Sequence, residues 1–390
     1  MNTSINLTNV ATATYIFTGT VRLLQPFATC SADLAKAAAD GATPVPVMWL
    51  DNARHGVIPS TGIKGGMLRR PAYSYIRQSV VDTTGNATPY TLEEFYFNAI
   101  GGIKSKEENQ PNSADDIAGW RAKNPILSLF GAGAAGYLNM VPGRLCVGNA
   151  ITKKPMREYV ASGARKDDFQ NDKYEMEYLS DEECAKYFTQ SALTKAKSKN
   201  NKKIEALEVK IKEAKSKEQY EKVAELELQL DELYKDQKSN PDKNSVAMPL
   251  AGWKAIPQGT ELDHTMRITK GTLVELGCLM AAISEFALNK PFLGAHYANG
   301  NGLIEAEWEV AVAGKNYEAP TVIGSVIMKP DHALEIVGDT LKQAFDLFNT
   351  KLAAGEFDLT IPSAEKLTGK VARKAKTAPM APAAPEATEA

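Results

Sequence analysis

The feature that most limits how this chain can fold is segment 195–243, which carries 13 lysines and 11 acidic residues among its 49 positions. Apolar residues recur there at helical spacing in two short runs, and Ser216 with Gln219 between the runs gives a capping-box signal. Each run is too short for a stable oligomeric coiled coil. We therefore expect an inserted antiparallel helical hairpin, with a partner-docking role left open. Its two apolar runs are Ile204, Leu207, Ile211, Ala214 and Val223, Leu226, Leu230, Leu233.

The chain outside this segment has the composition of a globular protein. Hydrophobic residues make up 44% of the 390 positions and charged residues 24%, which is enough to bury a substantial core. Apolar residues alternate with polar ones over residues 6–24, 264–268 and 303–312, which predicts strands. Residues 273–288 repeat apolar side chains at helical spacing, which predicts a buried helix.

Two further segments have a less regular pattern. Residues 28–45 are rich in alanine and end with Gly41 and Pro44, which fits either a short helix or a mobile loop. Residues 371–390 consist mainly of Ala, Pro, Thr and Glu and hold no recurring large apolar residue. This composition predicts a disordered tail that folding does not need.

The cysteines and histidines show no pattern of a metal or cofactor site. No CxxC is present, and both residue types are scattered, so the fold would have to assemble any cluster. We therefore expect no metal and no cofactor. These residues are Cys30, Cys146, Cys184 and Cys278, with His55, His264, His296 and His332.

The sequence gives no sign of a membrane segment. The N-terminus has no basic stretch before an apolar run, and no 18 consecutive residues lack a polar break. We therefore expect a cytoplasmic protein with reduced thiols and no membrane contact. The formal net charge is −2, so any attraction to nucleic acid must be local.

Residues 52–81 form such a local basic patch, because they contain no aspartate or glutamate. Within them, residues 58–70 have the pattern of a turn of small residues that opens a helix, with Ser60 or Thr61 as its cap. A helix N-terminus with glycines and basic side chains is typical of phosphate binding, although a solvated basic helix has the same pattern. GxxxxGK[ST] is absent, and no GxGxxG follows a strand in this segment, so nothing here supports nucleotide hydrolysis or dinucleotide binding. The basic residues are Arg54, Lys64, Arg69, Arg70 and Arg77.

A second glycine-rich stretch, residues 128–136, precedes a predicted strand at residues 144–147. Its glycines indicate close backbone packing. A tight turn between two elements explains this stretch at least as well as a ligand-binding loop.

Four motifs occur along the chain in a definite order. IPSTGIKGGMLR (58–69) matches IPGSSLKGxLR, and LFG (129–131) with GRLCVGNA (143–150) matches LFG followed by GRLIVRDA. IPQGTEL (256–262) matches vPxGtxF, and Leu293-Gly294 with Gly300, Gly302, Leu303 and Ile304 loosely follows LGGxxxxGxGxV. In this order they resemble the backbone subunits of the RAMP superfamily of CRISPR-associated proteins. The resemblance covers roughly residues 10–150 and 250–315.

This resemblance implies an α+β fold with a ferredoxin-like, RRM-type palm that carries finger and thumb insertions. Residues 1–150 would form the first part of the palm, with the finger segment and the basic patch, and residues 256–370 the second part. Residues 151–255 would form a thumb-like insertion that contains the hairpin. Met156 and Phe169 are candidates for the thumb element that wedges between bases.

The resemblance also implies a function in antiviral defence. Copies of the subunit would form a helical filament along one guide RNA (crRNA), present it for pairing with a target, and perform no catalysis. Lys64, Arg69 and Arg70 would hold guide phosphates, while Gly62, Gly65 and Gly66 would let the RNA approach. Arg54 and Arg77 are further candidates from the same patch. The likeness is greatest to type IV effector complexes, in which other effector subunits and a helicase would be partners.

Two alternatives remain open at this point. Type III relatives cut target RNA with an aspartate before the IPGSS turn, which would make the chain a metal-dependent endonuclease with Asp40 as its acid. Without a gap, that aspartate aligns with Pro44 instead. The other alternative is a scaffold protein whose hairpin docks a partner and whose basic patch is solvated.

Overall fold

The computed structural model describes residues 12–29, 42–86, 88–102, 113–133, 140–156, 159–163, 180, 182, 203–204, 206–215, 220–238, 251–314 and 318–361. The chain divides into two compact units. Unit 1 comprises Met1–Ala161 with Trp253–Ala390, and unit 2 comprises Ser162–Gly252. The predicted tail 371–390, Asp40 and Phe169 lie outside the described residues, as does most of segment 28–45.

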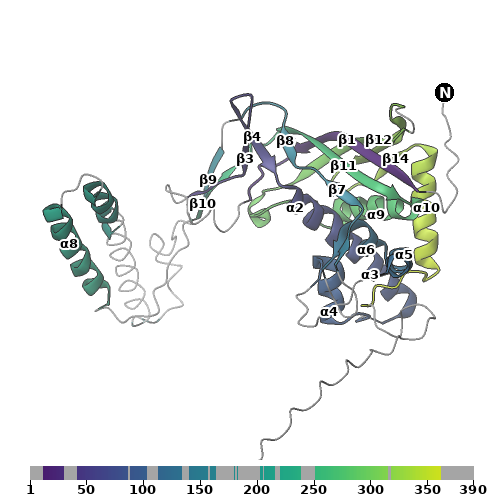
Figure 1. The fold of residues 1–390 in the computed structure, drawn as a ribbon, viewed down its shortest axis with the longest axis horizontal. Coiled ribbons are helices and arrows are strands. Elements are labelled where there is room, and N and C mark those ends of the chain that lie inside the picture. The colour runs from purple at the N-terminus through teal and green to yellow at the C-terminus, as the bar shows by residue number, and fades with distance from the viewer. Residues whose placement is uncertain are drawn as a thin grey trace, which may run out of the picture. The chain divides into compact units, whose positions relative to one another are not determined.

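Unit 1 is built on a nine-stranded sheet with the order β14-β13-β12-β1-β11-β8-β4-β3, and β7 also pairs with β11 (Figure 1). The first strand, β1, pairs antiparallel with both β11 and β12, although their residues lie far away in the sequence. The strands are β1 (Ala13–Leu23), β3 (Val47–Leu50), β4 (Ala53–Ile58), β7 (Leu145–Val147), β8 (Ala150–Thr152), β11 (Glu261–Gly271), β12 (Ile304–Val312), β13 (Thr321–Met328) and β14 (Glu335–Val337).

The centre of this sheet has the ferredoxin-like topology. In chain order, β1, a helix, β7, β11, a second helix and β12 form a β-α-β-β-α-β unit. In the sheet these strands lie in the order β12-β1-β11-β7, and every neighbouring pair is antiparallel. The α+β class predicted from the sequence is confirmed.

One face of the sheet is covered by helices (Figure 1). They are the first helix of the unit, formed by α2 (Ser60–Gly62), η1 (Ile63–Arg69) and α3 (Arg70–Thr84), together with α9 (Leu273–Asn289) and α10 (Asp339–Ala353). The alternation in β11 directs Leu262, His264, Met266 and Ile268 into the core between the layers. Helix α9 is buried along most of its length, as its apolar sequence predicts.

A smaller helical subdomain with its own core follows α3. It consists of α4 (Leu92–Phe95), η2 (Tyr96–Ile100), α5 (Ala114–Lys123), α6 (Pro125–Phe130) and the pair β5 (Gly131–Ala132) and β6 (Val141–Pro142). Its buried side chains are Phe97, Trp120, Leu127, Ala132 and Val141.

A separate three-stranded sheet has the order β2-β10-β9, with β2 (Ala42–Thr43), β9 (Tyr159–Gly163) and β10 (Ala251–Ala255).

Unit 2 contains the two predicted helices. Residues 206–215 are helical, and α8 (Tyr220–Lys238) follows them. Ile211, Ala214 and Val223 are buried together, with Leu226 and Leu230 packed against them. Glu208 accepts a hydrogen bond from Tyr234, and Lys215 pairs with Glu227, which is the contact pattern of antiparallel helices. Across the described residues of both units, no helix is long and apolar enough to cross a membrane.

Candidate functional site

The basic motif 58–70 lies where β4 leaves the sheet and enters the first helix. Pro59 is the N-cap and makes no side-chain cap bond, so the prediction that Ser60 or Thr61 caps the helix is wrong. The Ser60 backbone N–H instead donates to Asn149 Oδ1 at 2.8 Å. Because Asn149 belongs to the second motif, the fold joins the first two motifs through the helix N-terminus.

The helix has an unusual widened turn at this motif. Ile63–Arg69 forms a π-helix between α2 and α3, and its side chains Ile63, Met67 and Leu68 are buried in the main core. π-Helical turns occur frequently at functional sites. The buried side chains fix one side of the turn, which leaves Gly62 and Gly66 exposed and Gly65 partly exposed on the other.

No described residue of unit 1 requires glycine at these positions. A Cβ atom added at Gly62 or Gly65 would meet no atom within 4 Å, and one at Gly66 would meet only Leu293 Cδ2 at 3.5 Å. Gly62 has ordinary right-handed helical dihedrals, with φ −65° and ψ −44°. Glycine in a helix costs about 0.5–1 kcal/mol relative to alanine. The glycines therefore lower the stability of the helix, and neither packing among the described residues nor backbone conformation compensates for this loss.

The three glycines line a groove of about 580 Å³, which we call the glycine groove. Residues of the first helix form one wall, and the end of α9 with the loop of the fourth motif forms the other. Leu293 of that loop lies next to Gly66, and Gly294 also lines the groove. The first and fourth motifs thus meet at one site, although more than 200 residues separate them.

The glycine groove carries a cation on each wall. Arg70 lies on the first helix and is exposed, and Lys290 lies at the end of α9. Lys290 Nζ sits 4.0 Å from the ring centroid of Tyr297, which is 52% exposed. Glu285 also lines the groove and accepts a hydrogen bond of 2.7 Å from Ser74 Oγ. Lys290 and Tyr297 were not predicted from the sequence, although both adjoin the fourth motif and could have been found from it.

The other predicted cations do not share this groove. Arg69 is only 7% exposed, and its guanidinium donates to the backbone oxygens of Asn98 at 2.6 Å and Phe97 at 2.9 Å. Burial lowers the pKa of Arg69 to about 10, which leaves it charged at neutral pH. These two hydrogen bonds of the guanidinium link the helical subdomain to the first helix. Arg69 is therefore no candidate for a phosphate contact, which corrects the expectation from the sequence.

Lys64, Arg77 and Arg54 lie in three different places. Burial, followed by the charge of Arg69, lowers the pKa of Lys64, and Cys146 of β7 acts in the opposite direction. Arg77 lies two helical turns beyond Arg70 on α3. Arg54 lies on β4, opposite Trp49 of β3.

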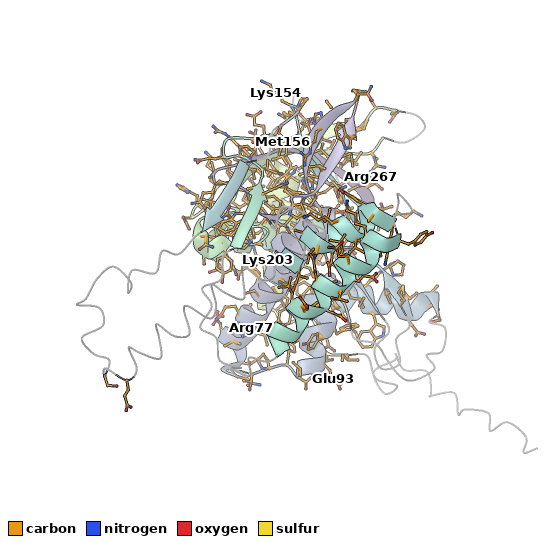
Figure 2. The ribbon with its side chains drawn as sticks, turned by 90° about the vertical axis from the view of Figure 1, so that its left-hand side faces the viewer. Arg77, Glu93, Lys154, Met156, Lys203 and Arg267 are labelled. Atoms are coloured by element: carbon orange, nitrogen blue, oxygen red, sulfur yellow. The ribbon has the colours of Figure 1, made fainter. Side chains whose placement is uncertain are left out.

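Met156, one of the two candidates for the wedge element, is partly buried and packs against the core. A Cβ at Gly56 would come within 2.5 Å of Met156 Sδ, and Met156 contacts the main core cluster. Figure 2 shows Met156 and Lys154 at one end of unit 1 and Arg77 at the other. The predicted basic patch is thus divided among several surfaces.

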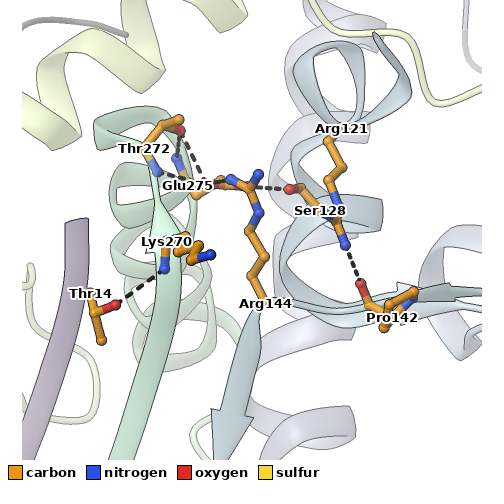
Figure 3. A network of polar contacts seen from close by, with 8 residues as sticks. All are labelled: Thr14, Arg121, Ser128, Pro142, Arg144, Lys270, Thr272 and Glu275. Atoms are coloured by element: carbon orange, nitrogen blue, oxygen red, sulfur yellow. Dashed lines mark hydrogen bonds and ion pairs between the residues drawn. The ribbon is translucent and has the colours of Figure 1, made fainter. Parts of the chain in front are cut away.

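The second motif joins α6, β7 and α9 through one buried carboxylate (Figure 3). Glu275 is 3% exposed and forms a capping box with Thr272 at the start of α9. Arg144 Nη1 approaches Glu275 Oε2 at 2.9 Å, and Ser128 Oγ donates to Glu275 Oε1. Arg144 of the second motif therefore stabilises the fold through its pair with Glu275.

The fourth motif needs its glycines for packing, unlike the first. Gly302 has φ +88°, and an added Cβ would lie 1.9 Å from the Leu293 carbonyl oxygen. The Leu293 N–H donates to the Gly302 carbonyl at 2.9 Å, which closes the loop. This closure fixes the loop wall of the glycine groove.

The open face of the sheet does not resemble the base-stacking face of an RRM. Such faces present aromatic side chains to RNA bases. Strands β12, β1 and β11 carry no aromatic side chain on their outward positions, and Glu305, Glu307 and Glu309 of β12 lie there opposite Arg22, Thr20 and Thr18. Within the described residues, no group of three or more His, Cys, Asp or Glu could hold a metal ion. The glycine groove is therefore the best candidate site in the described part of unit 1.

Comparison with known proteins gives little further information. No family model and no curated protein matches the chain. A solved structure titled "Type IV-B CRISPR Complex" contains a chain that is similar to this one with a TM-score of 0.31 and 10% identity. The match covers 78% of this chain and 92% of the other. A likeness of this size establishes neither a shared fold nor a shared function.

Proposed function

We propose that this chain binds the backbone of a single-stranded guide RNA in the glycine groove, as a non-catalytic backbone subunit of a CRISPR effector ribonucleoprotein. The order of the four sequence motifs supports the family assignment. The groove supports the RNA contact, because it joins the first and fourth motifs and carries a cation on each wall.

The observation that carries the proposal is that no packing contact with a described residue explains why these helical positions are glycine. Alanine fits at Gly62 and Gly65 with no contact inside 4 Å and would stabilise the helix. A ligand that lies against the helix explains why the side is left bare, because each missing Cβ lets a phosphate or ribose approach the backbone. Arg70 and Lys290 then neutralise phosphates on either side, and Tyr297 offers a ring for a base.

This mode of binding has defined properties. Phosphate contacts carry no sequence information, so the affinity is sequence-tolerant and depends on salt. Target recognition is left to pairing by the guide. In this proposal further copies of the chain, other effector subunits and a helicase are the partners, and no residue of the chain performs catalysis.

The first test is the nucleic acid content of the purified protein. We expect an absorbance ratio at 260 and 280 nm above that of protein alone, and extractable RNA of defined size. Arg70→Glu with Lys290→Glu should abolish this RNA, whereas Lys342→Glu, an exposed position on α10, should retain it. Equal RNA content in both variants would contradict the proposed site.

A titration with RNA gives the quantitative form of the test. Loss of two phosphate contacts should reduce the slope of log K against log salt by about 1.4 for a single strand. Neutral variants Arg70→Gln and Lys290→Gln serve for this measurement, because charge reversal adds repulsion. An unchanged slope would show that neither side chain contacts a phosphate.

A further inference from the structure

The hairpin of β3 and β4 exposes an aromatic ring at the edge of the large sheet. β3 is the last strand in the order of the large sheet and therefore lies at its edge. Trp49 is 68% exposed, whereas Trp120, Trp253 and Trp308 are 4%, 6% and 0% exposed. Val47 lies on the same face of β3 and is 36% exposed. Exposure of this much indole surface to water is unfavourable, and an exposed apolar patch marks an interaction site.

The hairpin holds this ring in a fixed place. Asp51 and Asn52, at its tip, have φ of 48° and 62°, which is the conformation of a two-residue type I′ turn. Trp49 pairs with Arg54 in the strand register, and β4 is anchored to β8 through Val57 and Ile58. A rigid turn and a paired strand mean that the backbone that carries the ring is already in place before any ligand arrives.

The surroundings of the ring are positively charged. Cross-strand partners share a face, so Arg54 lies beside Trp49. The Met156 N–H donates to the Arg54 carbonyl oxygen at 3.0 Å, which brings the segment with exposed Lys154 to the same strand (Figure 2). Asp51 in the turn offsets one of these charges. An indole face with a guanidinium on its cross-strand neighbour and a lysine on the adjoining segment is complementary to a base with its phosphates.

We propose that Trp49 is a stacking platform for a nucleobase of single-stranded RNA, with Arg54 and Lys154 supplying positive charge beside the adjoining phosphates. The proposal rests on the proposed function, since it gives the same RNA a second contact. Stacking on an aromatic face is sequence-tolerant because every base has such a face. It therefore adds affinity to the phosphate contacts without adding a sequence preference.

Tryptophan fluorescence tests the contact directly, because the other three tryptophans are buried. The full-length protein, freed of co-purified RNA at high salt, is titrated with an unstructured oligouridylate of about 30 nucleotides, with emission and anisotropy recorded together. We expect RNA to quench the wild-type emission and to leave that of Trp49→Phe nearly unchanged. Trp49→Ala should bind about 5- to 150-fold more weakly, and Trp49→Phe should retain most of the affinity.

Matched controls separate the possible failures. Tyr220→Ala removes another exposed aromatic side chain, in unit 2, and should leave the affinity unchanged. If Arg70→Gln weakens binding but Trp49→Ala does not, the stacking proposal is overturned and the proposed function stands. If the wild type binds no RNA, both are overturned. If Trp49→Ala instead lowers the molar mass of RNA-free protein in light scattering, the hairpin is a contact between copies and the stacking proposal is overturned.

Discussion

Protonation of His264 should make the stability of unit 1 fall as the pH is lowered. His264 is 1% exposed, and its Nδ1 accepts a hydrogen bond of 3.1 Å from Trp308 Nε1. The ring is therefore neutral in the fold, with its own proton on Nε2. Burial lowers the pKa of His264 from 6.5 to about 4, and the Gly148 backbone has a smaller, opposite effect.

The sign and size of the effect follow from proton linkage. Because the pKa is lower in the folded state, the unfolded chain binds more protons between about pH 6.5 and pH 4, and stability is lost as the pH falls through this range. The full effect amounts to about 3 kcal/mol, of which about 2 kcal/mol falls between pH 7 and pH 5. Above pH 7 this residue adds no pH dependence.

The assay is urea unfolding at pH 7 and pH 5, followed by tryptophan fluorescence. All four tryptophans belong to unit 1, so the signal reports that unit. His264→Asn keeps an acceptor for Trp308 and does not titrate, so its free energy of unfolding should fall about 2 kcal/mol less than that of the wild type. His332→Asn, at an exposed position, should follow the wild type. If wild type and His264→Asn lose the same free energy, the reasoning about the buried ring is refuted.

Three further predictions concern the glycine groove and its support. Gly65→Ala should raise the free energy of unfolding by about 0.5–1 kcal/mol yet weaken RNA binding, as measured by denaturation and anisotropy. Gly302→Ala should destabilise the protein by more than about 2 kcal/mol in urea unfolding, because its Cβ would strike the Leu293 carbonyl at a positive φ. Glu275→Gln should lower the free energy of unfolding by about 2 kcal/mol or more, because Arg144 loses its buried carboxylate partner. A thermal shift assay measures this loss of stability.

Each of these has a result that contradicts it. Unchanged RNA affinity in Gly65→Ala would mean that no ligand approaches the helix there. A Gly302→Ala variant as stable as the wild type would show that the loop can relax, and wild-type stability in Glu275→Gln would show that the pair with Arg144 contributes little.

Local sequence patterns predicted some of the regular elements, whereas others, such as β13 and α10, were not predicted. Strand β11 and helix α9 follow their apolar periodicity, because burial of one strand face or of a whole helix leaves a repeating signal. The two helices of unit 2 were predictable for the same reason. The cap of the first helix could not be predicted in this way, because the acceptor for the Ser60 N–H is Asn149, which lies 89 residues away in the sequence.

The sequence by itself determined that a glycine-bearing helix start with several cations exists in unit 1. Only the tertiary structure decided which cations a ligand could reach. Arg69 and Arg70 are adjacent in sequence, yet the carbonyls of Phe97 and Asn98 bind the first, while the second lines the glycine groove with Lys290. The physical reason is that the exposure of a side chain depends on which distant elements pack against its helix, and no local pattern encodes that packing.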